Sequence, residues 1–477
     1  REREFAKLWK AAERWLQGQG QIVSVIGEAG IGKSRLVREL VDETRRRGAM
    51  SLILEGCCVS IGLSINLLPF LDILRAYFGL SGEDDTDIIA RKVTEATNYL
   101  FPQNADEVLP FLGYLLSIRF DSDLDEKLKF ATPEQIRHQT LMRLREFFEA
   151  LARKKPLLLI LDDLHWADDL SVELLFLLLD SLKTVPLMLL CVYRPEQEHR
   201  IWQLRDLARR KCTDRYTEIE LSPLSDQESR KLVETLLTIE DLPESVRDMI
   251  LQKSEGNPFY IEEVIRSLID SDLVYQDEGR WKARAGVADI AVPDTIQGII
   301  LARVDRLQVK AKNVLQCASV LGRLFKYRLL EHLTPLELDL RLNELEEREL
   351  VHEERAVPEL EYAFKHALTQ EATYQSVLVR QRKKIHHRAA VGIEALYRER
   401  LEEYYEELAH HYSRSDDAEK AVEYLIKAGD KAKQSYANEA AVSHFQKALE
   451  ILEQRKLEHQ DRKLEALRGL GEVYFGI

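Results

Sequence analysis

The chain has 477 residues, a formal net charge of −14 and an ordinary globular composition, with 45% hydrophobic and 31% charged residues. This length predicts about three to four domains. The acidic balance argues against a broad binding surface for nucleic acid or anionic membranes. Five cysteines without a C-x-x-C pair, no signal peptide and no long apolar stretch predict a soluble, cytoplasmic protein. Because the chain does not begin with Met, we expect it to be a piece of a longer protein.

The first motif follows an amphipathic helical pattern at residues 1–17. Gly27-Glu28-Ala29-Gly30-Ile31-Gly32-Lys33-Ser34 stands between an apolar run at 22–26 and a second helical pattern. A glycine-rich turn between a strand and a helix directs backbone N–H groups at a phosphate, and the helix N-terminus adds positive charge. We expect Lys33 to reach the β- and γ-phosphates and Ser34 to hold Mg²⁺. The alternative is a loop that merely turns a strand.

A second strand is expected at 51–55, and residues 60–150 predict a helical insertion. The next apolar run begins at Leu157 and ends in Asp162 and Asp163. Ligands bind at the carboxyl end of such a buried strand in an open α/β sheet. We expect Asp162 to bind Mg²⁺, directly or through water, and Asp163 to polarise an attacking water. The alternative is that these acids only cap the following helix.

Arg194 follows the next buried run, at 187–193. A guanidinium forks onto phosphate oxygens, so Arg194 is placed to contact a γ-phosphate. The alternative is a surface arginine before the Pro195 turn. With a last strand at 216–221, strands separated by helices predict a doubly wound parallel sheet.

After Pro223 the pattern predicts helices alone up to residue 307. Residues 311–390 mix helices with a short strand pair, at 350–353 and 362–364, that predicts a small wing. The adjacent histidine pairs of this half are interpreted as surface residues and not as metal ligands: His386-His387 and His410-His411.

From about residue 400 the pattern becomes repetitive. The 4-then-3 spacing of small and large residues recurs in two sets, Ala421, Leu425, Ala428 and Ala441, Phe445, Ala448. Small residues let paired helices approach closely while large ones fill the gap. This indicates a helical-hairpin repeat.

Taken together, the chain resembles the STAND class of signal-transduction ATPases, in the branch found with class III nucleotide cyclases, LuxR-type regulators and some serine/threonine kinases. The resemblance covers nearly the whole chain, and it is specific because several short motifs occur in the same order and spacing. These are Arg1-Glu2, the phosphate loop, Leu161-Asp162-Asp163-Leu164-His165-Trp166-Ala167-Asp168, Tyr193-Arg194-Pro195, Gly256-Asn257-Pro258-Phe259, Val292-Pro293-Asp294-Thr295-Ile296 and Phe364-Lys365-His366-Ala367-Leu368.

The resemblance implies an α/β plus all-α chain with four parts. A P-loop NTPase core is expected at 1–221, a helical lid at 222–307, a winged-helix-like domain at 308–398 and tetratricopeptide-like repeats at 399–477. ATP or ADP and Mg²⁺ are the implied cofactors. The implied nucleotide-binding residues are Arg1, Gly27, Gly30, Gly32, Lys33, Ser34, Arg35, Pro258 and His366.

Specific roles follow from the same resemblance. Pro258 is expected on the adenine side of the nucleotide, Arg194 at the γ-phosphate and His366 at the β-phosphate of a closed ADP form. Asp163 stands where vigorous ATPases have Glu, which is one methylene longer. The shorter acid would position water less well, which favours a slow switch over a motor.

The predicted function is an ATP/ADP-dependent switch with weak ATPase activity. It would regulate a linked effector outside this chain and sense a protein partner through the repeats, with self-association on ATP binding as a further expectation. Neither nucleic acid nor membrane is an expected partner of this piece. Two alternatives stay open: a nucleotide-stabilised scaffold without turnover, and a winged-helix AAA-type ATPase that acts on DNA.

Overall fold

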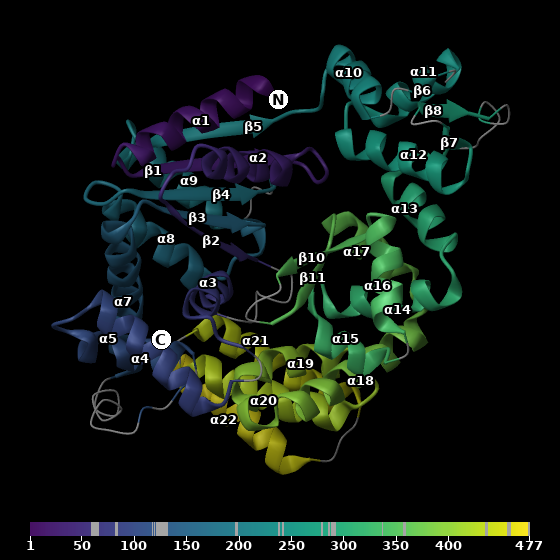
Figure 1. Cartoon of the computed structure of the whole chain (residues 1–477). Helices are drawn as coiled ribbons and strands as arrows, with labels where there is room; N and C mark the ends of the chain where they lie inside the picture. The colour runs from purple at the N-terminus through teal and green to yellow at the C-terminus, as the bar shows by residue number, and fades with distance from the viewer. Residues whose placement is uncertain are drawn as a thin grey trace.

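The fold is taken from a computed structural model of the chain. The structure describes all residues except 59–65, 82–83, 117, 119, 121–131, 196–198, 237–238, 241–242, 278–279, 285–286, 288–291, 336, 356–358, 435–436, 456–458 and 476–477. A sheet-containing part holds the N-terminus, and helices make up most of the rest (Figure 1).

Five parallel strands form the central sheet, in the order β2-β3-β4-β1-β5. They are β1 (Gln21–Gly27), β2 (Leu52–Cys57), β3 (Leu157–Asp162), β4 (Leu187–Tyr193) and β5 (Tyr216–Leu221). Every residue of β1, β3 and β4 is buried, which explains why these strands are nearly continuous apolar runs. All five predicted strands are confirmed.

Helices cover both faces of this sheet (Figure 1). On one face, α1 (Glu2–Leu16) and α2 (Lys33–Arg46) pack on side chains such as Val23, Leu158 and Leu190. On the other face, residues of opposite parity, such as Ile22, Leu159 and Leu189, join a second core. Its helices include α8 (Asp169–Ser181) and α9 (Ile201–Lys211). The predicted doubly wound class is therefore confirmed.

The insertion between β2 and β3 is helical where it is described. Its helices are α3 (Leu68–Phe78), α4 (Thr86–Leu100), α5 (Ala105–Leu115) and α7 (Pro133–Lys154). α7 begins at the capping box formed by Thr132 and Gln135.

The segment after β5 contains a small sheet as well as helices. The helices are α10 (Asp226–Leu236), α11 (Glu244–Ser254), α12 (Pro258–Asp270) and α13 (Ile296–Asp305). The sheet has the order β6-β8-β7, formed by β6 (Ile239–Glu240), β7 (Val274–Asp277) and β8 (Arg280–Ala283). The prediction of helices alone up to residue 307 is therefore wrong. Strands of two to four residues are too short to produce a clear period-two signal.

Residues 309–396 form helices around a three-stranded sheet. The helices are α14 (Val309–Leu321), α15 (Tyr327–Leu333), α16 (Leu338–Glu347), α17 (Ala367–Ser376) and α18 (Val379–Leu396). The strands are β9 (Leu324–Lys326), β10 (Val351–Arg355) and β11 (Glu361–Phe364). β11 pairs antiparallel with both others, so the predicted strand pair forms and gains a third strand.

The C-terminal helices stack as the repeat pattern predicts. They follow the 3₁₀ segment η4 (Arg398–Tyr404) and are α19 (Tyr405–Ser413), α20 (Ala418–Gln434), α21 (Asn438–Gln454) and α22 (Gln460–Phe475). A Cβ added to Gly429 or Gly469 would lie 2.7 or 2.4 Å from the ring of Phe445. The two glycines therefore allow α20 and α22 to approach α21 closely.

Two of the four paired histidines lie inside this helical half. His386 and His411 are buried, and their Nδ1 atoms are 2.9 Å apart. Burial lowers the pKa of His386 to about 2 and of His411 to about 3. The surface interpretation is wrong for these two, whereas His387 is exposed. His386 shares a helix face with the buried Ala389, Ala390 and Ile393, a signal that favours the interior.

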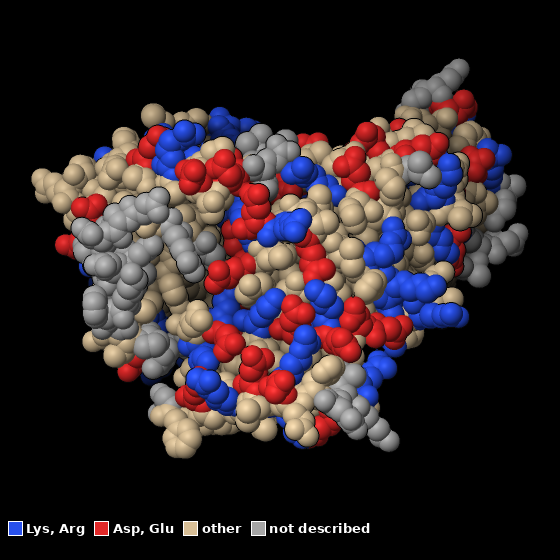
Figure 2. All heavy atoms as spheres, turned by 90° about the horizontal axis from the view of Figure 1, so that it is seen from below, with Lys and Arg blue, Asp and Glu red and all other residues tan. Residues whose placement is uncertain are grey.

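Acidic and basic side chains are intermingled on the face drawn in Figure 2. This face therefore has no extended patch of positive charge to which a polyanion would bind. Within the described part of the chain, none of the helices combines the length and the apolar composition needed to cross a membrane.

Candidate functional site

The phosphate loop connects β1 to α2 at the carboxyl edge of the sheet. Gly30 and Gly32 have φ angles of 75° and 102°, in the left-handed region that glycine adopts without strain. Lys33 begins α2, and its Nζ donates to the carbonyls of Gly27 (2.8 Å) and Glu28 (2.9 Å). Burial lowers the pKa of Lys33. The loop thus holds an ammonium group and glycine amides together at a helix N-terminus.

Asp162 and Asp163 lie beside Lys33. Asp162 ends β3 and is buried, and its Oδ1 accepts a hydrogen bond of 2.9 Å from the backbone N–H of Asp163. Burial, and then the charge of Asp163, raise the pKa of Asp162. The charges of both acids in turn favour the charged form of Lys33. The sheet therefore brings the lysine and the two acids together, as the sequence predicts.

The backbone at Asp163 adopts a left-handed conformation. Its φ of 54° lies in a region that costs most residues with a side chain about 1–2 kcal/mol, although Asp adopts it more readily than most. Such outliers cluster at functional sites, where the surrounding structure holds them. Together with its place beside Lys33, this conformation makes Asp163 a functional candidate.

The residues present fit a magnesium–nucleotide complex. The Ser34 hydroxyl and the Asp162 carboxylate are hard oxygen ligands of the kind that Mg²⁺ prefers. Loop amides and the Lys33 ammonium suit phosphate oxygens. When bound, Mg²⁺ would supply charge neutralisation at the phosphates.

Arg1 and Arg35 contact the elements around the loop. Arg1 Nη2 donates to the carbonyls of Ile31 (3.2 Å) and Ser222 (2.6 Å), so Arg1 lies against the loop. Arg35 is largely exposed and pairs through Nη1 with Glu262 of α12 at 3.4 Å. The Arg35 side chain thus contacts α12. A role of Arg35 in nucleotide binding stays a prediction.

The N-terminus of α12 packs on the phosphate loop. Asn257 caps the helix, and its Nδ2 donates to the carbonyl of Ala29 (3.3 Å). A Cβ added to Gly30 would lie 2.9 Å from Cβ of Phe259, so the approach requires glycine. Pro258 is therefore held near the loop as the first residue of α12. Its contact with adenine stays a prediction.

Arg323, just before β9, contacts both acids. Its Nη1 donates to Oδ2 of Asp163 (2.7 Å) and lies 3.5 Å from Oδ2 of Asp162. Burial opposes its charge, but Cys57 and the two acids offset this and raise the pKa of Arg323. No local pattern marks this residue, because the contact joins positions 160 residues apart.

The segment that follows Arg323 contacts Arg194 and contains His366, two more of the predicted residues. Arg194 Nη2 lies 3.7 Å from Oε1 of Glu371 on α17. His366 precedes α17, and its ring centroid is 4.1 Å from that of Phe259. Burial lowers the pKa of His366 to about 3, so it is neutral at pH 7. Its contact with a β-phosphate stays a prediction.

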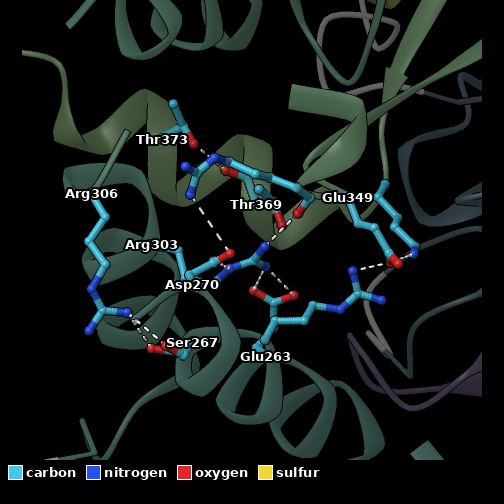
Figure 3. Close-up of polar contacts among 11 residues, drawn as sticks. Glu263, Ser267, Asp270, Arg303, Arg306, Glu349, Thr369 and Thr373 are labelled. Atoms are coloured by element: carbon cyan, nitrogen blue, oxygen red, sulfur yellow. Dashed lines mark hydrogen bonds and ion pairs between the residues drawn. The ribbon is translucent and has the colours of Figure 1, made fainter. Parts of the chain in front are cut away.

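A buried ionic network joins α12 and α13 to the same segment (Figure 3). Arg303 Nη1 donates to both carboxylate oxygens of Glu263 (2.9 and 2.7 Å), and Nε donates to Asp270 (2.8 Å). Nη2 donates to the carbonyl of Arg348 (2.6 Å). The side chains of Arg303 and Glu263 are each 2% exposed. Breaking such a buried pair costs about 3–5 kcal/mol, so Arg303 firmly couples α13 to α12, and its hydrogen bond to Arg348 links this pair of helices to the later segment.

Two family models match parts of the sequence. Residues 1–190 match the AAA ATPase domain, and residues 225–282 match a domain of unknown function. The first match includes the phosphate loop, Asp162 and Asp163.

Two curated relatives are much longer than this chain. An uncharacterized protein of Rhizobium meliloti (strain 1021) is 27% identical over 495 residues, which cover 100% of this chain and 45% of that protein. The peroxide stress-activated histidine kinase mak3 of Schizosaccharomyces pombe is 25% identical over 201 residues, which cover 40% of this chain and 8% of the kinase. The chain thus spans less than half the length of these relatives.

Two solved structures are similar to this chain at low identity. A STAND protein with a tetratricopeptide repeat sensor from Pyrococcus horikoshii has a TM-score of 0.44 and 13% identity, covering 99% of this chain and 66% of that chain. The ORC2 protein of Aeropyrum pernix, in ADPNP-ADP complexes, has a TM-score of 0.34 and 12% identity, covering 83% of this chain and 94% of that chain. Both TM-scores are below 0.5.

Proposed function

Because residues 1–190 form an AAA-type ATPase domain, we propose that the chain is a nucleotide-controlled switch of STAND type with slow ATP hydrolysis. Lys33 and the loop amides would bind the phosphates, and Ser34 with Asp162 would hold Mg²⁺. Asp163 would orient the attacking water. Arg194 would contact the γ-phosphate.

The Arg323 contact carries the proposal. Its guanidinium lies 2.7 Å from Asp163 and 3.5 Å from Asp162. These are the carboxylates that would orient the attacking water and bind Mg²⁺. A second cation at the same oxygens would be repelled by Arg323. Arg323 binding and metal binding at these acids therefore oppose each other. This opposition is the differential contact that a two-state switch needs.

Two further contacts support the same reading. Glu371 competes with a γ-phosphate for Arg194, and His366 lies against Phe259 beside the phosphate loop. Both come from the segment that follows Arg323. Binding of ATP with Mg²⁺ would thus weaken several contacts of this segment at once, whereas ADP would leave Arg194 with Glu371.

The repeats are placed to influence the ATPase domain. Tyr114 of the insertion donates to the carbonyl of Gln434 on α20 (2.8 Å), and Arg75 pairs with Glu403 of η4 (3.3 Å). A protein partner that binds the repeats would act on these contacts. We extend the proposal to such a partner, and to a linked effector elsewhere in a longer protein.

Steady-state phosphate release tests this function against the two alternatives. We expect slow, Mg²⁺-dependent turnover, well below the enzyme median of about 10 s⁻¹. EDTA should stop it, because Asp162 and Ser34 act through the metal. Nucleotide binding without any turnover would favour a static scaffold. Duplex DNA that binds at low salt and stimulates turnover would favour the DNA-acting ATPase.

A further inference from the structure

His165 is a buried polar residue beside the two acids that the roles above do not use. It lies in the short 3₁₀ helix η2 (Leu164–Trp166), directly after Asp163. It is 3% exposed, and neither ring nitrogen has a hydrogen-bond partner among the described residues. A buried donor or acceptor left unpaired costs about 1–3 kcal/mol. Another arrangement of the site that gives the His165 ring a hydrogen-bond partner would therefore remove this free-energy cost.

The surroundings of His165 are those of the phosphate site. Its Nδ1 lies 3.9 Å from Oδ1 of Asp163. Burial, and then the charges of Arg194 and Lys33, lower the pKa of His165 to about 3. The imidazole is therefore neutral at pH 7, with one N–H donor and one acceptor nitrogen.

The two oxygens of Asp163 face different partners. Oδ2 accepts the 2.7 Å hydrogen bond from Arg323, whereas Oδ1 faces His165 at a distance about 1 Å too long for a hydrogen bond. Loss of the Arg323 contact would leave the carboxylate free to move by that distance.

We propose that His165 is a positioning residue for Asp163. When Arg323 leaves, Nδ1–H of His165 donates to Oδ1 of Asp163 and fixes the carboxylate in the orientation that holds the attacking water. This inference rests on the proposed ATPase function and deepens it. It also offsets the shorter side chain of Asp163 relative to Glu. A carboxylate that is hydrogen-bonded to a rigid ring orients water better than one that is free to rotate.

Three substitutions separate this role from simple packing. The amide nitrogen of Asn takes approximately the place of Nδ1, and that of Gln approximately the place of Nε2. We expect His165→Leu to lower kcat about tenfold or more, the equivalent of one hydrogen bond, with little change in KM for ATP. His165→Asn should restore most of kcat and His165→Gln should not. Substitution of the exposed His138 by Leu is the surface control.

A binding measurement gives a second readout without turnover. His165→Leu should weaken the affinity for ADP with aluminium fluoride and Mg²⁺, a mimic of the transferring phosphate and its water, about tenfold, and should leave the affinity for ADP unchanged. Equal losses for both ligands, or an Asn variant no better than the Leu variant, would show that His165 only packs. Failure of the unmodified protein to bind ADP would instead overturn the proposed function itself.

Discussion

Lys33→Ala is expected to abolish nucleotide binding, with a loss of about 100-fold or more in affinity for ATP and about tenfold or more for ADP, which has no γ-phosphate. The ammonium lies at the centre of the loop, where it would make charge-assisted hydrogen bonds to two phosphates, each worth about 1.5–3 kcal/mol. Isothermal titration calorimetry on the full chain measures this directly.

A matched control is Lys7→Ala, because Lys7 is exposed on α1. The control should bind nucleotide as the unmodified protein does. Thermal melting shows whether the Lys33 variant is folded. Tight ATP binding by the folded Lys33 variant would contradict the assignment of the loop as the phosphate site.

Arg323→Gln should release the two acids and raise turnover about tenfold or more. The variant loses a charge-assisted hydrogen bond to Asp163 and an ion pair with Asp162. Together these contacts favour the arrangement in which Arg323 lies on the two acids by a few kcal/mol. Stopped-flow release of a fluorescent ADP, together with steady-state phosphate release, reports the change.

The matched control is Arg380→Gln, at an exposed position near the start of α18. It should leave both rates unchanged. The Arg323→Gln variant could have normal ADP affinity but a turnover equal to or below that of the unmodified protein. This result would contradict the proposal that Arg323 restrains the two acids. Normal ADP affinity also excludes simple unfolding as the cause.

The central sheet and the grouping of Lys33 with two acids at its edge could be predicted because their signals are local. β1, β3 and β4 are buried on both faces, so each is a run of apolar residues. Parallel strands all end at the same edge, which places Lys33 near Asp162 and Asp163 without further information.

The remaining parts of the site depend on contacts between distant segments. Arg323 reaches Asp163 only because the segment after α14 folds back on the ATPase domain. His386 meets His411 only because α18 packs on α19. A period of hydrophobic residues indicates which face of an element is buried, but not which partner covers it.

The small sheet formed by β6, β7 and β8 escaped prediction for a local reason. Each strand has two to four residues, and Val274 is the one residue of β7 that is buried. With one buried side chain, a strand shows no alternation that distinguishes it from a loop.

The distance between the ATPase domain and the Arg323 segment tests the central claim most directly. Spin labels on Lys7→Cys of α1 and Arg380→Cys of α18 would report it by double electron–electron resonance. The account predicts a single short distance with ADP and a longer one with Mg²⁺ and a non-hydrolysable ATP analogue. The same distance with both nucleotides, each bound at saturation, would contradict it.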